Sequence, residues 1–131
     1  MVLANDAEYG TGAGDPLDVA LLDYAVNQGV NVSEMLGEHP RWSLLPFDSA
    51  LKFMRVTVKE QGRLISYLKG APEVLLRRSL MSDDERRSWE EKAEGYAVEG
   101  FRVLALARRA GEGDDDVVFS WPRSALGRAT P

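Results

Sequence analysis

An aromatic residue and two lysines stand near the ends of a predicted β-hairpin, and these residue types suit a nucleotide. Phe47 lies just before the first strand, Lys52 at its beginning, and Lys69 at the end of the second strand. An aromatic ring offers a plane on which a base can stack, and ammonium groups attract phosphates. The hypothesis that follows is a nucleotide site formed by Phe47, Lys52 and Lys69.

The hairpin is predicted from the alternation of side chains. Apolar and polar residues alternate over residues 52–58, which is the period-two pattern of a half-buried strand. Residues 64–69 are similarly rich in strand formers, and Gly62 suits a tight turn between the two runs.

The length of this turn decides whether the two lysines meet. A two-residue turn places Met54 opposite Lys69, and Lys52 then shares the face of Lys69. Two ammonium groups on one face repel each other, so this register calls for an anion between them. A three-residue turn directs the lysines to opposite faces. Both turn lengths remain open from the sequence.

Four short blocks of sequence follow one another along the chain: Gly14-Asp15-Pro16 with Asp18–Leu22, Pro46-Phe47-Asp48-Ser49 with Lys52 and Met54, Lys69-Gly70-Ala71-Pro72-Glu73, and Gly100–Ala107. In this order they resemble the nucleotide-binding domain of a P-type cation-transporting ATPase of the E1-E2, calcium-pump-like kind. The resemblance covers residues 1–121. Any one block alone is weak evidence for this family, but the four blocks in this order are specific for it.

The resemblance assigns roles to particular side chains. It implies that the nucleotide-binding residues are Phe47, Lys52, Lys69, Gly70, Arg102, Asp15 and Asp18. Phe47 would stack on adenine, and the lysines would border the pocket. Arg102 would meet a phosphate, and the two aspartates would lie at the rim.

Three of these residues also have a purely structural interpretation. Asp15 can cap a helix that starts at Pro16, and Asp18 stands where a capping box has its acid. The family more often has a glutamate where this chain has Asp18. The aspartate side chain is shorter and therefore less suited to direct contact with a ligand. Arg102 could extend to the edge of the sheet rather than bind a phosphate.

The composition bounds the class of protein. The chain has 131 residues, 44% hydrophobic and 28% charged, which predicts one soluble globular domain. A net charge of −5 speaks against nucleic acid as a partner. There is no cysteine and a single histidine, so disulfides are excluded and a metal site is not expected. No apolar run reaches the ~20 residues of a membrane span, so no membrane contact is expected.

The expected fold is α+β, an antiparallel sheet flanked by helices. Residues 1–121 are expected to form the nucleotide-binding domain, incomplete at its N-terminus relative to the family, with a returning strand over residues 117–121. Residues 122–131 are expected to be a disordered tail, because they are small and polar and depart from the family pattern.

The resemblance implies ATP or ADP as ligand, Mg²⁺ in the intact pump, and the pump's phosphorylation domain as partner, on the cytoplasmic side of a membrane. The phosphorylation motif Asp-Lys-Thr-Gly-Thr is not in the chain, and no catalytic residue is expected. The chain should therefore present ATP without hydrolysing it. The alternative is an interaction domain of the same fold that has lost the nucleotide, which Ala50-Leu51 favours because the family usually has charged residues there.

Overall fold

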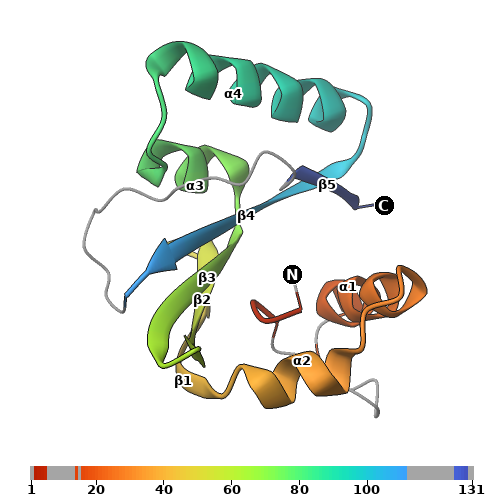
Figure 1. The fold of residues 1–131 in the computed structure, drawn as a ribbon. Helices are drawn as coiled ribbons and strands as arrows, with labels where there is room; N and C mark the ends of the chain where they lie inside the picture. Colours follow the sequence, from red (N-terminus) through yellow and green to blue (C-terminus); the bar gives the residue numbers. More distant parts are fainter. Residues whose placement is uncertain (1, 6–13, 15, 112–125, 130–131) are drawn as a thin grey trace.

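The computed structural model describes residues 2–5, 14, 16–111 and 126–129, and these form an antiparallel sheet flanked by helices (Figure 1). The strands pair in sequence order: β1 (Arg41–Asp48), β2 (Phe53–Glu60), β3 (Arg63–Gly70), β4 (Arg102–Ala110) and β5 (Leu126–Ala129). The helices are α1 (Pro16–Asn27), α2 (Val32–Glu38), α3 (Pro72–Arg78) and α4 (Asp83–Val98). The predicted α+β class is confirmed.

The β2–β3 hairpin has the two-residue turn. Glu60 pairs with Arg63 and Met54 with Lys69. The turn residues Gln61 and Gly62 have φ of 51° and 77°. Positive φ at both central residues matches the right-handed twist of the flanking strands, and glycine adopts it at little cost. The register on which the site hypothesis depended is therefore the observed one.

Helices cover both faces of this sheet. α3 and α4 lie on one side of it, and α1 and α2 lie toward the other (Figure 1). The core under α3 consists of Phe53, Leu68, Leu75, Ala105 and Ala107. The core on the other face consists of Leu3, Met54, Val56 and Val58. Because side chains alternate along a strand, β2 contributes Phe53 to one core and Met54 to the other.

Two of the helices start at residues of the types that favour the N-cap position. The side chain of Asn31 accepts from the Glu34 amide at 3.0 Å, and that of Ser82 accepts from the Glu85 amide at 3.2 Å. Each bond satisfies a helix N–H that has no partner inside the helix.

The C-terminal end of the chain differs from the expectation. Within the expected tail, the described residues Leu126–Ala129 form β5 on the free edge of β4, with Arg102 opposite Ala129. An edge strand leaves backbone N–H and C=O groups without partners, and β5 supplies them. The predicted returning strand over residues 117–121 lies outside the described residues.

Glu60, the last residue of β2, connects the C-terminal end of α2 to the sheet through its side-chain contacts. Its carboxylate accepts from Arg108 Nη2 at 3.0 Å and from the Tyr67 hydroxyl at 3.2 Å, and it lies 3.0 Å from His39 Nε2. His39 ends α2. The hydrogen bond from Arg108 is the main reason why the pKa of Glu60 is lowered from its ordinary value of 4.5.

We expect Glu60→Gln to make the protein less sensitive to acid. A lowered folded-state pKa means that the ionised carboxylate stabilises the fold above pH 4.5, and that this contribution is lost as the pH falls through the folded-state pKa. Because the side chain is partly exposed, the contribution should be about 1 kcal/mol or less. Urea unfolding at neutral pH and at about pH 3.5 measures it.

The matched control is Glu91→Gln, an exposed glutamate on α4. Its stability should fall between the two pH values as much as that of the wild type. If Glu60→Gln loses as much stability on acidification as both of them, the assigned role of Glu60 is contradicted.

Candidate nucleotide-binding site

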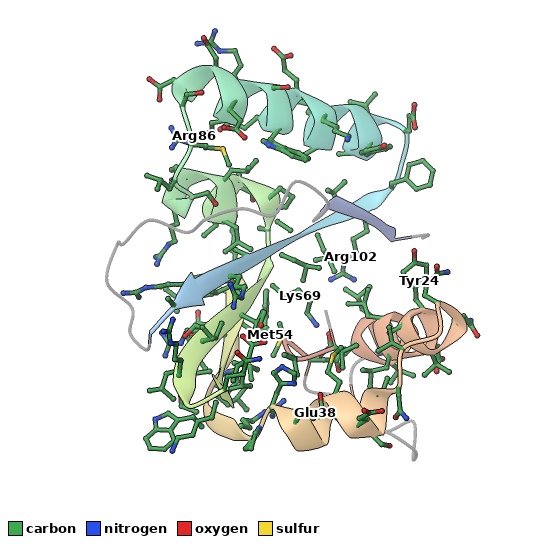
Figure 2. All side chains as sticks on the ribbon, in the orientation of Figure 1. Tyr24, Glu38, Met54, Lys69, Arg86 and Arg102 are labelled. Atoms are coloured by element: carbon green, nitrogen blue, oxygen red, sulfur yellow. The ribbon has the colours of Figure 1, made fainter. Side chains whose placement is uncertain are left out.

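A cavity of about 390 Å³ opens on the face of the sheet that α1 approaches. It is lined by Gly14, Leu17, Asp18, Pro46, Phe47, Met54, Lys69, Gly70, Arg102 and Leu104. Figure 2 shows Met54, Lys69 and Arg102 on the strands beside α1. The volume of this cavity falls in the range of small-molecule sites. The structure therefore brings Phe47, Lys69, Gly70, Arg102 and Asp18 together.

Phe47 lies on the edge strand β1, where the pairing with β2 is irregular between Leu45 and Asp48. Pro46 fits this position, because proline cannot donate to a ladder and is confined to edges and bulges. The Phe47 side chain is not part of a core, since the residue is 62% exposed. An exposed phenyl ring at the mouth of a cavity is available for stacking.

Gly70 is required by the close approach of two backbones. A Cβ at this position would lie 2.3 Å from the carbonyl oxygen of Lys52 and 2.6 Å from Cα of Phe53. The next amide, that of Ala71, donates to the same Lys52 oxygen at 2.9 Å. Glycine therefore allows the end of β3 to lie close against the start of β2 before Pro72 begins α3.

Lys69 and Asp18 form an ion pair at the floor of the cavity. Lys69 Nζ donates to Asp18 Oδ1, and the two residues are only 5% and 9% exposed. The Asn5 side-chain amide donates to the backbone oxygen of Asp18 at 2.9 Å, which ties the N-terminal segment to α1. Asp18 was expected at the rim, and the structure places it against Lys69 instead.

This pairing was missed although the sequence held a signal for it. Lys69 shares the face of Met54, which the alternation predicts to be buried. A buried ammonium group is costly unless a carboxylate compensates it. A lysine at this buried position therefore indicates a carboxylate on the helix that covers it.

Lys52 is the predicted residue that the structure places elsewhere. It precedes β2 with a φ of 65°, which interrupts the strand alternation on which the shared face depended. Its Nζ lies 3.8 Å from Glu73 Oε1 on α3. The expectation that Lys52 and Lys69 share one face is therefore wrong, and Lys52 does not line the cavity.

Arg102 is the first residue of β4 and is exposed at the cavity. Because the charges of Lys69 and Asp18 offset each other, its guanidinium sets the net positive charge of the described lining. Asp15 lies outside the described residues.

Two other features bear on the class of site. Among the described residues, no three His, Cys, Asp or Glu side chains converge as metal ligands would. None of the helices in the described ranges combines the length and the hydrophobicity that crossing a membrane requires.

Known proteins with similar sequences point to one family. The family described as P-type ATPase, cytoplasmic domain N, matches residues 2–116. The Synechocystis sp. cation-transporting ATPase pma1 is 36% identical over 76% of this chain and 12% of its own length. The Bacillus subtilis calcium-transporting ATPase is 34% identical over 79% of this chain and 13% of its own length.

The Lactococcus lactis calcium-transporting ATPase 1 is 29% identical over 82% of this chain, which spans 14% of that relative. The chain thus spans only about an eighth of the length of these pumps. The matched residues 2–116 include every described element except β5. The chain therefore belongs to the P-type ATPase family, as a cytoplasmic domain N.

Proposed function

We propose that this chain binds ATP in the cavity beside α1 and presents it to the phosphorylation domain of a cation-transporting P-type ATPase. The observation that carries the proposal is an exposed Phe47 at the mouth of a cavity that also holds Arg102 and the Lys69–Asp18 pair. A flat aromatic surface next to fixed cations suits a molecule with a base at one end and phosphates at the other.

Each lining residue then has a physical task. The adenine stacks on Phe47, a contact worth ~1–3 kcal/mol by comparison with other base–aromatic pairs. Arg102 donates to phosphate oxygens, for which the guanidinium geometry is suited. The Lys69 ammonium carries three hydrogens. Its bond to Asp18 uses one of them and fixes the group's position for the nucleotide.

Mg²⁺ finds no site of its own in the described lining. That lining offers one carboxylate, Asp18, which already accepts from Lys69. Bound to ATP in an intact pump, the ion would neutralise charge on the phosphates during their transfer. The residues of this chain would hold the base and orient the phosphates, and the acceptor aspartate would be supplied by the phosphorylation domain.

The feature that favoured an interaction domain without nucleotide lies away from the cavity. Ala50 and Leu51 line a separate hollow with Val74, Arg77 and Arg78. Neither Ala50 nor Leu51 lines the nucleotide cavity, so the apolar character of these two residues leaves its lining unchanged. This feature therefore does not count against ATP binding in the cavity beside α1.

Replacing Phe47 with alanine tests the proposal. Loss of a stacking contact of ~1–3 kcal/mol should weaken both ATP and ADP about 5- to 150-fold. Because the ring is exposed, stability should change by no more than about 0.5 kcal/mol. Calorimetric titration gives the affinity and urea unfolding the stability.

Trp42→Ala is the matched control, since Trp42 is another exposed aromatic residue of β1 and contacts Lys59 rather than the cavity. It should bind nucleotide as the wild type does. Unchanged ATP affinity in folded Phe47→Ala, or an equal loss in Trp42→Ala, would refute the stacking role.

A further inference from the structure

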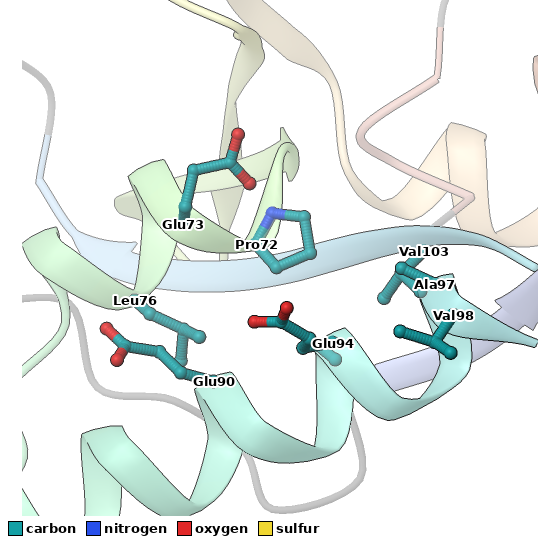
Figure 3. Close-up of a pocket in the computed structure, with 9 residues that line it drawn as sticks. Pro72, Glu73, Leu76, Glu90, Glu94, Ala97, Val98 and Val103 are labelled. Carbon is teal, nitrogen blue, oxygen red and sulfur yellow. The ribbon is translucent and has the colours of Figure 1, made fainter.

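A second cavity, of about 640 Å³, lies on the opposite face of the sheet between α3, α4 and β4 (Figure 3). We refer to it as the α3–α4 groove. Its apolar lining includes Leu76 of α3, Ala93 and Ala97 of α4, and Val103 of β4. None of the residues that line it lines the nucleotide cavity.

The groove exists because α4 packs little against the rest of the domain. Ala93 is the one buried residue of this 16-residue helix. A helix of a globular protein usually buries a stripe of larger apolar side chains. Here the small residues Ala93 and Ala97 line the groove, and the neighbouring Val98 is 81% exposed. An apolar surface of this kind marks a contact site when a partner's chemistry fits it.

Carboxylates lie beside this apolar surface, mainly on α4. Glu90 and Glu94 extend from α4 toward α3, one helical turn apart (Figure 3). Glu73 lies on the α3 side, and Lys52 is 3.8 Å from it. The potential along the α4 side is therefore negative, and a complementary partner is cationic.

We propose that the α3–α4 groove docks a basic amphipathic segment of another polypeptide. A short aliphatic side chain of that segment lies over Ala93 and Ala97, and Lys or Arg side chains on either side of it meet Glu90 and Glu94. Apolar contact supplies the affinity, and the carboxylates orient the segment and favour its approach.

The charge of the groove disfavours other occupants. Nucleic acid and free nucleotides are anionic and would be repelled. A second copy docked through the same surface would place glutamates against glutamates, because a two-fold interface joins identical patches. This chain also carries a net charge of −5.

The groove and the nucleotide cavity can be filled at the same time. Along β4, Arg102 and Leu104 line the cavity while Val103 between them lines the groove. Gly70 lines the cavity, and Pro72, two residues later, lines the groove. A partner in the groove therefore lies on the far side of the sheet from the nucleotide.

Fluorescence anisotropy with a labelled peptide of about 12 leucine and lysine residues in amphipathic order tests the proposal. Binding should saturate at one peptide per chain and weaken as salt rises. A peptide with glutamate in place of each lysine should not bind. The double variant Glu90→Gln/Glu94→Gln should weaken the basic peptide about five- to tenfold.

Glu91→Gln is the control on the same helix, because Glu91 does not line the groove. It should bind the peptide as the wild type does. Ala97→Trp, which fills the groove, should abolish saturable binding, and circular dichroism checks that it is folded. If it is not, the Glu90→Gln/Glu94→Gln result stands by itself as the test.

Three results would overturn the proposal. The first is binding that never saturates, and the second is an equal loss in Glu91→Gln and in the double variant. The third is a dimer, seen by sedimentation, that Ala97→Trp dissociates, since the occupant would then be a second copy.

Discussion

Lys69→Met should destabilise the fold by about 3–5 kcal/mol, because it leaves the Asp18 carboxylate buried without its cation. The pair lies in the floor of the cavity, where both residues are nearly excluded from water. It also joins β3 to α1, so the docking of that helix depends on it. Chemical unfolding of the wild type and the variant measures the difference.

The double variant Asp18→Leu/Lys69→Met separates stability from binding. With both charges removed, an apolar pair of similar size can be close to neutral, so most of the lost stability should return. ATP affinity should stay low, since no ammonium group remains. Lys92→Met, on the exposed side of α4, is the control and should cost no more than about 0.5 kcal/mol.

Equal stabilities of Lys69→Met and Lys92→Met would show that the ion pair does not support the fold. Recovery of full ATP affinity in the double variant would show that Lys69 does not contribute to the site.

Gly70→Ala should be the second damaging change. The added methyl group would lie 2.3 Å from the Lys52 oxygen and 2.6 Å from Phe53 Cα, and backbone atoms cannot move aside as a flexible side chain does. The cost should be about 1–3 kcal/mol, as for other overpacked positions. Because Gly70 also lines the cavity, ATP affinity should fall with it.

Gly95→Ala is the matched control within α4, where an added Cβ meets nothing within 4 Å. Alanine is the better helix former, so this variant should gain about 0.5–1 kcal/mol. If Gly70→Ala were as stable as the wild type, the close approach of β2 and β3 would not constrain this residue.

The hairpin was the most predictable part of the fold. The alternation in residues 52–58 and the Gly62 turn are local signals that predict a hairpin. Of the two turn lengths that the sequence left open, the observed two-residue turn pairs Met54 with Lys69. The helix starts at Asn31 and Ser82 were predictable for the same reason. Such features depend on neighbours in sequence rather than on the whole fold.

The environments of the two lysines were less predictable. Lys52 lies at the end of a strand, where one residue with positive φ redirects the chain. The partner of Lys69 is 51 residues away, on a helix whose docking the sequence does not specify. The strand alternation indicates that Lys69 is buried and needs a carboxylate, but which carboxylate pairs with it depends on tertiary packing.

The last strand shows a different limit of local patterns. Leu126–Ala129 has no strong strand signal, and its pairing depends on the free edge of β4. The α3–α4 groove could not be predicted from local sequence patterns for a similar reason. From the sequence alone, Glu90 and Glu94 look like residues of the solvent-exposed face of α4. Only the position of α3 shows that they border a cavity.

An NMR titration of the isotopically labelled chain with ATP would show residue by residue whether ATP occupies the cavity beside α1. We expect saturable shifts of the backbone amides of Phe47, Lys69, Gly70, Arg102 and Leu104, with those of Glu90 to Val98 in α4 unchanged. No shift at millimolar ATP, or saturable shifts confined to α4, would contradict this expectation.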